Sequence, residues 1–225
     1  MAIGIYNPKA YGGQPWIDAK NSHSDSLPII RYNVIMKQCF IGVVGCNGSG
    51  KTTLCDYLKE NGFYTVSLSD IVRKHAKNQG LPNDRDTLTN LANQLKKEHG
   101  LDYFANETMK DIQEQGHSKV VFDSIRHPKE IQALQQHRVS FIGIETPVET
   151  RYNRIVDRKK GTDFVSFDTF KRQDADEATG TSSGQNILAC LAMCHTVIKN
   201  DGDINKLHKN IDDIVHMIDI GKSIC

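Results

Sequence analysis

Short apolar runs alternate with longer stretches of helical periodicity from residue 39 to the end of the chain. The runs that predict β-strands are Cys39–Val44, Tyr64–Leu68, Lys119–Asp123, Val139–Glu145 and Thr196–Lys199. The first run is almost continuously apolar, as expected of a strand that is covered on both faces. Strands and helices in alternation predict an α/β fold built around a parallel sheet.

Two apolar stripes at helical spacing predict helices between and after these strands. One stripe comprises Leu88, Leu91, Ala92 and Leu95. The other comprises Ile204, Leu207, Ile211, Ile214, Val215 and Ile218. Asp203 directly precedes the second stripe, so we expect its side chain to cap that helix.

The beginning of the chain differs in composition from the rest. It shows no sustained period and contains Pro8, Pro15 and a polar stretch at 21–26. We therefore predict a poorly ordered N-terminal extension at 1–36 and one folded domain at 37–225.

Composition and charge narrow the possible classes of function. The chain has 28 Lys and Arg against 27 Asp and Glu, a formal charge of +1, which argues against a general binder of nucleic acid or acidic membranes. No apolar run approaches the roughly 18 residues that span a bilayer, and no secretory signal is recognisable. Six scattered cysteines without a C-x-x-C pair predict free thiols in a reducing cytoplasm. Cys190, Cys194 and His195 lack the second half of a zinc site.

Residues 45–52 carry the strongest chemical signal. Their sequence fits G-x-x-x-x-G-K-[ST] at every fixed position, between a predicted strand and a helical pattern. Glycines let successive backbone N–H groups point at phosphate oxygens, and the following helix adds its positive N-terminal end. Lys51 is expected to neutralise the β- and γ-phosphates of ATP, and the Thr52 hydroxyl to ligate Mg²⁺. The nucleotide-binding residues predicted here are Gly45, Asn47, Gly48, Ser49, Gly50, Lys51, Thr52 and Thr53.

Other motifs decide which kind of P-loop protein this is. The sequence has no D-x-x-G, N-K-x-D or L-S-G-G-Q motif, which excludes a GTPase switch and a transporter ATPase. An apolar strand ends at Asp123, which places this carboxylate beside the phosphate loop. Asp123 is expected to hold Mg²⁺ through water or to accept a proton from the phosphoryl acceptor. Arg126 projects from the same edge and offers a planar fork for a second phosphate.

A helix that carries several arginines is predicted after Pro147. Its core-facing stripe comprises Val148, Tyr152, Ile155 and Val156. Along its flank lie Arg151, Arg154 and Arg158. Three aligned arginines repel one another unless an anion lies among them, so this flank is expected to bind phosphate. The charged segment that follows predicts a lid over about 151–184.

These motifs, together with Ile198–Gly202 and in this order along the chain, resemble the P-loop nucleoside monophosphate kinase superfamily. The chain is most similar to the branch that holds dephospho-CoA kinase, deoxynucleoside monophosphate kinases and adenylate-kinase-like proteins. The resemblance covers about residues 37–220. It implies a three-layer α/β/α fold with a five-stranded parallel sheet, a helical substrate-binding region after the second strand and a lid after the fourth.

The resemblance also assigns acceptor-side residues. Asp70 and Arg73 would face the acceptor at the start of the substrate-binding region, with Arg85 as a further contact and Asp102 as a weaker one. The segment from Asp123 to Arg126 departs from the D-G-x-P-R form of adenylate kinases, which leaves the identity of the acceptor open.

Lid and adenine residues follow from the same resemblance. Arg154 and Arg158 match the first lid arginines, and Arg172 matches one that returns from the other side. Asn200 and Gly202 match the loop that packs on adenine, although Asn-Asp-Gly is also a common turn.

The expected function is ATP-dependent transfer of the γ-phosphoryl group to a (deoxy)nucleoside monophosphate, with ATP and Mg²⁺ as cofactors. The expected catalytic residues are Lys51, Asp123, Arg126, Arg154 and Arg158. A dephospho-CoA kinase, with Asp123 as base, is an alternative, and so is a regulatory nucleotide-binding protein without phosphotransfer. We expect a cytoplasmic monomer or homodimer that binds small nucleotides and neither nucleic acid nor membrane.

Overall fold

A computed structural model describes residues 38–158, 166–180 and 185–219, so the predicted N-terminal extension lies outside the described residues. Within this part, five parallel strands form one sheet in the order β2-β3-β1-β4-β5. The strands are β1 (Cys39–Val44), β2 (Tyr64–Ser67), β3 (Lys119–Asp123), β4 (Ser140–Glu145) and β5 (Thr196–Lys199). The predicted α/β fold with a five-stranded parallel sheet is therefore confirmed, and the strand bounds differ from the prediction by one residue in β2 and in β4.

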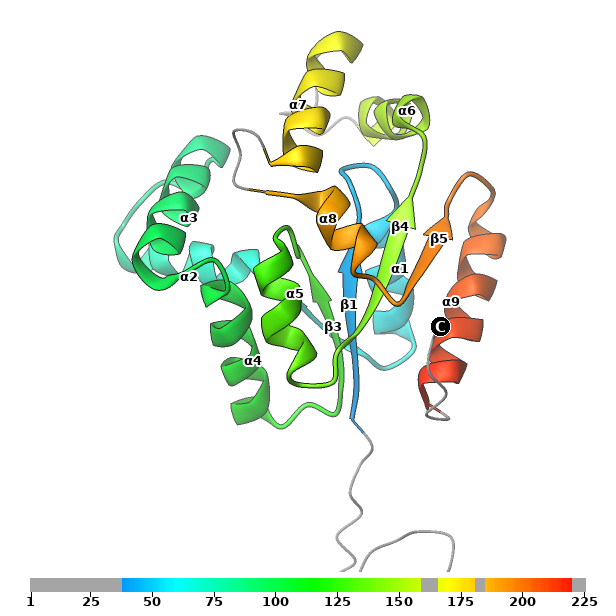
Figure 1. Cartoon of the computed structure of the whole chain (residues 1–225), viewed down its shortest axis with the longest axis horizontal. Helices are drawn as coiled ribbons and strands as arrows, with labels where there is room; N and C mark the ends of the chain where they lie inside the picture. The colour runs from blue at the N-terminus through cyan, green and yellow to red at the C-terminus, as the bar shows by residue number, and fades with distance from the viewer. Residues whose placement is uncertain (1–37, 159–165, 181–184, 220–225) are drawn as a thin grey trace, which may run out of the picture. The chain divides into compact units, whose positions relative to one another are not determined.

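The helices of the described part connect and cover these strands (Figure 1). They are α1 (Lys51–Glu60), α2 (Ser69–Asn78), α3 (Arg85–His99), α4 (Tyr103–Gln115), α5 (Pro128–Gln135), α6 (Val148–Arg158), α7 (Phe167–Thr179), α8 (Ile187–Ala192) and α9 (Ile204–Asp219). Helices α2, α3 and α4 form the helical region after the second strand. The predicted cap of α9 is confirmed, since Asp203 Oδ1 accepts the backbone N–H of Lys206 at 2.9 Å.

The sheet separates two apolar cores, because successive side chains of a strand point to opposite faces. On one face, Ile41 and Val43 of β1 pack with α1 and α9. On the other face, Phe40 and Val44 pack with α2, α3, α4, α5 and α8. Helices thus cover both faces, which explains the nearly continuous apolar sequence of β1.

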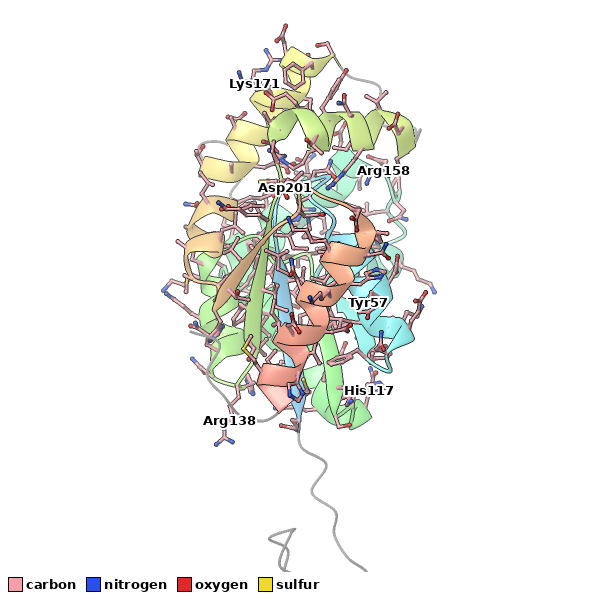
Figure 2. All side chains as sticks on the ribbon, turned by 90° about the vertical axis from the view of Figure 1, so that its right-hand side faces the viewer. Tyr57, His117, Arg138, Arg158, Lys171 and Asp201 are labelled. Carbon is pink, nitrogen blue, oxygen red and sulfur yellow. The ribbon has the colours of Figure 1, made fainter. Side chains whose placement is uncertain are left out.

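The carboxyl ends of the strands lie at one end of the domain. Helices α6 and α7 lie beyond these ends in Figure 1. Figure 2 shows Arg158 and Asp201, which follow β4 and β5 along the chain, toward that end. His117 and Arg138, which come shortly before β3 and β4, lie toward the opposite end. The loops after the strands therefore gather on one side of the sheet, where ligands bind in open parallel sheets.

The cysteines and the helix lengths of the described part bear on the predicted thiol state and on membrane insertion. The five cysteines that it contains are free thiols, as predicted. None of its helices is long and apolar enough to cross a membrane.

Gly42 makes close packing possible in the middle of β1. A Cβ atom at this position would lie 2.6 Å from the Phe141 ring of the neighbouring strand and 2.9 Å from Cδ1 of Ile125. Both side chains are fully buried, so neither has room to move away. The glycine therefore serves the packing of a large ring across the central strand.

We expect Gly42→Ala to lower the free energy of unfolding by about 1–3 kcal/mol, because the added methyl group overpacks the core. Chemical denaturation measures this loss. Phe141→Leu removes the ring that the methyl group would meet, so the double variant should lose less than the sum of the two single losses. Strictly additive losses would contradict the proposed collision.

Candidate active site

The phosphate loop joins β1 to α1 and takes a conformation that depends on its glycines. Gly48 and Gly50 have φ values of 78° and 108°, which L side chains rarely adopt. A Cβ on Gly48 would lie 2.7 Å from the Arg151 carbonyl oxygen, and one on Gly50 would collide with Asn200 Nδ2. The sequence of the loop therefore allows both its curvature and the close approach of α6 and of the segment after β5.

Lys51 begins α1, and its side chain folds back over the loop. Its Nζ donates to the carbonyl oxygens of Gly45 at 2.7 Å and Cys46 at 2.9 Å. Burial lowers the pKa of Lys51; Asp123 opposes this shift and Arg126 adds to it. The loop and the lysine thus enclose a site in which an added anion would stabilise the charged ammonium.

The backbone carbonyl of Ser49 joins the loop to the ends of β4 and β5. It accepts hydrogen bonds from Asn200 Nδ2 at 2.8 Å, Thr146 Oγ1 at 3.0 Å and Arg154 Nη1 at 3.5 Å. Arg154 Nη2 also donates to the Asn200 carbonyl at 3.2 Å. Asn200 is buried, and its side-chain amide is bonded to the loop backbone.

Arg151 departs from the predicted flank of α6. It is buried, forms a two-pronged ion pair with Asp174 of α7, and donates to the Asn47 carbonyl at 3.3 Å. Burial disfavours its charge, but the hydrogen bonds and charge of Asp174 outweigh burial and raise the pKa of Arg151. The expected convergence of three arginines on an anion is therefore wrong for Arg151, which fastens α7 to α6 and the loop.

The predicted core stripe of α6 needs one further correction. Ile155 is buried as expected, but Val156 is 41% exposed, because α6 packs on the loop and α7 through the side that carries Arg151 and Ile155. The buried face of α6 therefore includes the charged Arg151 and excludes the apolar Val156.

Asp123 ends β3 beside the loop. Its Oδ1 atom is buried and has no hydrogen-bond partner within the described residues. The next residue, Ser124, has φ 63°, and its hydroxyl accepts a hydrogen bond from Ser67 Oγ at 2.8 Å. A buried carboxylate oxygen without a partner is costly unless a cation or a water binds it.

Two side chains near the start of α1 and the end of β3 can serve as ligands of Mg²⁺. The Asp123 oxygen and the exposed Thr52 hydroxyl at the start of α1 are ligand types that Mg²⁺ accepts. No group of three or more His, Cys, Asp or Glu side chains suited to a metal occurs in the described ranges. Mg²⁺ takes one or two carboxylates and completes its coordination with waters and substrate phosphates, so this sparse set fits the ion.

Arg126 follows the serine turn and is fixed from both ends. Its backbone N–H donates to Glu130 Oε2 at 2.8 Å, and its Nη1 donates to Gln185 Oε1 at 2.9 Å. The guanidinium is also 4.0 Å from Glu177 of α7. Arg126 therefore lies between the end of β3 and the predicted lid.

A cavity of about 950 Å³ lies at this end of the sheet and includes part of the site. The predicted site residues that line it are Gly45, Asn47, Lys51, Arg73, Arg126 and Arg158. Those that do not line it include Thr52, Asp70, Asp123, Arg154, Asn200 and Gly202. The cavity thus brings together the loop, the segment after β3, the end of α6 and the helical region after β2.

Several of the predicted acceptor-side and lid residues are exposed or do not line the cavity. Asp70 and Arg73 form an exposed ion pair of 2.8 Å, and the side chain of Arg85 lies outside the described residues. Asp102 accepts from Asn106 Nδ2 at 3.1 Å at the start of α4 and does not line the cavity. Arg172 is exposed on α7 and is likewise absent from the lining.

Sequence reasoning missed several cavity residues. They are Lys96 of α3, Glu130 of α5, and Gln173, Asp176, Glu177 and Gln185. One signal was available: Pro128 with Glu130 two residues later is typical of a helix start, and Glu130 and His127 indeed form a capping box. For Lys96, the sequence offers only a basic residue beside an apolar stripe.

Comparisons with known proteins agree with this architecture. The chain is 29% identical over 181 residues to a UPF0200 protein of Methanoregula boonei, an alignment that covers 80% of this chain and 97% of the relative. Its fold is similar to that of shikimate kinase from Acinetobacter baumannii, with a TM-score of 0.52, 17% identity, and coverage of 83% and 96% of the two chains. It is also similar to TT1252 from Thermus thermophilus, with a TM-score of 0.53, 16% identity, and coverage of 80% and 97%.

At these identities the two solved structures establish the fold, which is the P-loop kinase-like α/β/α fold expected from the superfamily resemblance. A family model described as an AAA domain matches residues 41–176, from β1 through the phosphate loop to α7. Because this match spans more than half of the chain, the protein belongs to the AAA domain family.

Proposed function

We propose that the protein transfers the γ-phosphoryl group of ATP to a (deoxy)nucleoside monophosphate. The observation that carries this proposal is the cavity itself, in which Lys51 of the phosphate loop shares one space with Arg126 and Arg158. A cavity of about 950 Å³ whose wall includes these three cations suits transfer between two phosphate-bearing molecules. The kinase-like fold is compatible with this reaction.

The donor nucleotide would bind through the loop. The backbone N–H groups of residues 45–50 and the positive end of α1 would hold the phosphates, with Thr53 on the first turn of that helix. Lys51 would exchange its two carbonyl partners for phosphate oxygens. The segment from Asn200 to Gly202, fastened to the loop by the Asn200 amide, would lie beside the adenine.

Thr52 and Asp123 would hold Mg²⁺. The unpartnered Asp123 oxygen supports this assignment, because a bound water or cation would satisfy it. Bound there, the ion would neutralise charge on the phosphate oxygens.

The acceptor would bind on the side of Arg126 and Arg73. Arg126 would exchange Gln185 for the acceptor phosphate, since a phosphate oxygen is a stronger partner for a guanidinium than an amide oxygen. Asp70 keeps Arg73 oriented through their ion pair.

Transfer itself requires little covalent chemistry from the protein. An acceptor oxygen forms a bond to the γ-phosphorus as the bond to the β–γ bridging oxygen breaks, and charge spreads over the equatorial oxygens. Lys51, Arg126 and Arg158 would stabilise that charge, while Arg154 would position the loop through the Ser49 and Asn200 carbonyls. A monophosphate acceptor is already ionised, so no strong base is needed.

Two other functions are distinguished from this one by a test with different acceptors. A hydroxyl acceptor, as in dephospho-CoA kinase, would require Asp123 as base, and a regulatory protein would bind ATP without transfer. Purified protein with ATP and Mg²⁺ should release ADP with a deoxynucleoside or ribonucleoside monophosphate and not with dephospho-CoA. Acceptor-independent hydrolysis, or binding without turnover, would contradict the proposal.

The proposed setting is the cytoplasm, with small nucleotides as partners. The free thiols of the described part suit a reducing compartment. The balanced charge of the chain argues against nucleic acid and membrane as partners.

We expect Lys51→Ala to lower kcat by about 100-fold or more, because it removes a cation from the developing phosphate charge. Steady-state ADP release measures this loss, and circular dichroism should show an unchanged fold. Lys59→Ala, which removes an exposed lysine from the last turn of the same helix, should keep full activity. Near wild-type turnover in Lys51→Ala would refute phosphotransfer at this loop.

We expect Asp123→Asn to raise the Mg²⁺ concentration for half-maximal activity by about 10-fold or more, since the amide replaces a charged ligand or its support. The additional thermal stabilisation that Mg²⁺ gives to the ATP complex should shrink in parallel. Asp56→Asn, at an exposed position of α1, is the matched control. An unchanged Mg²⁺ requirement would remove Asp123 from the metal site.

A further inference from the structure

Lys96 of α3 is a buried lysine on the wall of the cavity, outside all the motifs considered above. Its side chain is only 12% exposed. It lines the cavity together with Glu130, whose side chain is 2% exposed. A buried ammonium is costly unless its charge and its three N–H donors find partners.

The charge of Lys96 has partners, but its donors are not used within the described residues. Nζ lies 3.7 Å from Glu130 Oε1, which is an ion-pair distance longer than a hydrogen bond, and 5.6 Å from the centre of the Phe104 ring. No hydrogen bond from this ammonium occurs in the part of the chain that the structure describes. Donors are therefore available toward the cavity.

Glu130 does not depend on Lys96 alone. Its Oε2 accepts the backbone N–H groups of Arg126 at 2.8 Å and His127 at 3.0 Å, in the first turn of α5. Burial raises the pKa of Glu130, against the opposing effects of Lys96 and these two amides. The carboxylate thus balances the charge of Lys96 without using its donors, and the pair as a whole is neutral.

Apolar side chains form part of the cavity wall, next to polar residues of α3 such as Thr89 and Asn93. The apolar part comprises Leu68, Val72, Leu88, Ala92, Phe104, Ile125 and Ile187. A flat, weakly polar ring would pack against such a wall, and an oxygen on that ring would need a donor. A neutral carbonyl suits a neutral Lys–Glu pair better than a carboxylate, which would face the charge of Glu130.

We propose that Lys96 donates a hydrogen bond to a neutral carbonyl oxygen on the body of the phosphoryl acceptor, so that the cavity prefers monophosphates with a keto-bearing base. This inference rests on the proposed function. Lys96 would thus determine which base is preferred, while other cations of the cavity bind the phosphates.

Calorimetric titration of dTMP, dGMP and dAMP into the full chain tests this preference without requiring turnover. Wild type should bind dTMP or dGMP about 10-fold or more tightly than dAMP, whose base has no carbonyl. Lys96→Met should abolish this difference. Lys97→Met, which changes the exposed neighbour on the same helix, should retain it.

Lys96→Met also leaves Glu130 without its cation. A loss of stability from this unpaired charge must therefore be distinguished from the loss of the hydrogen bond to the base. The double variant Lys96→Met/Glu130→Gln removes that unpaired charge and should recover thermal stability while the preference stays lost. A double variant that regains the preference, or a wild type that binds dAMP as tightly as dTMP and dGMP, would overturn the proposal. Binding as expected without ADP release would refute phosphotransfer and leave the role of Lys96 intact.

Discussion

The backbone carbonyl of Ser49 is the point at which the separate parts of this domain meet. Asn200 after β5, Thr146 after β4 and Arg154 of α6 all donate to it. A carbonyl oxygen with two lone pairs can accept several donors, and in a buried setting each of them replaces water. Loss of these bonds would leave the loop attached through β1, α1 and the hydrogen bond from Arg151 to the Asn47 carbonyl. Segments that follow β4 and β5, far from the loop in sequence, therefore help to hold the phosphate loop in place.

Buried charges organise the rest of the site in a similar way. Arg151 holds α7 through Asp174, and Lys96 and Glu130 hold α3 near the first turn of α5. In a low-dielectric interior each charge needs a partner. Removing one member of either pair would leave the other charge buried and unpaired, which strongly lowers the stability of the fold. Lys96 and Glu130 line the cavity, whereas Arg151 and Asp174 join α6 to α7 outside its lining.

The cations of the site divide into those that face the cavity and those that hold its walls. Lys51, Arg126 and Arg158 line the cavity, whereas Arg151 is enclosed between α6, α7 and the loop. Acidic residues of α7, Asp176 and Glu177, also line the cavity, and Glu177 Oε2 lies 4.0 Å from Arg126 Nη1. Ligand binding would have to exchange these internal partners, which links occupancy of the site to the position of α7.

Local sequence determined the strands, the phosphate loop, the cap of α9 and the free thiols, since each depends on apolar periodicity or on residues close together in the chain. Helical spacing placed Arg151, Arg154 and Arg158 along one flank, but it does not show what covers a helix. Only the tertiary structure decided that Arg151 faces Asp174 and that Lys96 meets Glu130, 34 positions later in numbering. The energy of a charge depends on the partners and burial that distant segments provide, and periodicity along one helix contains no information about them.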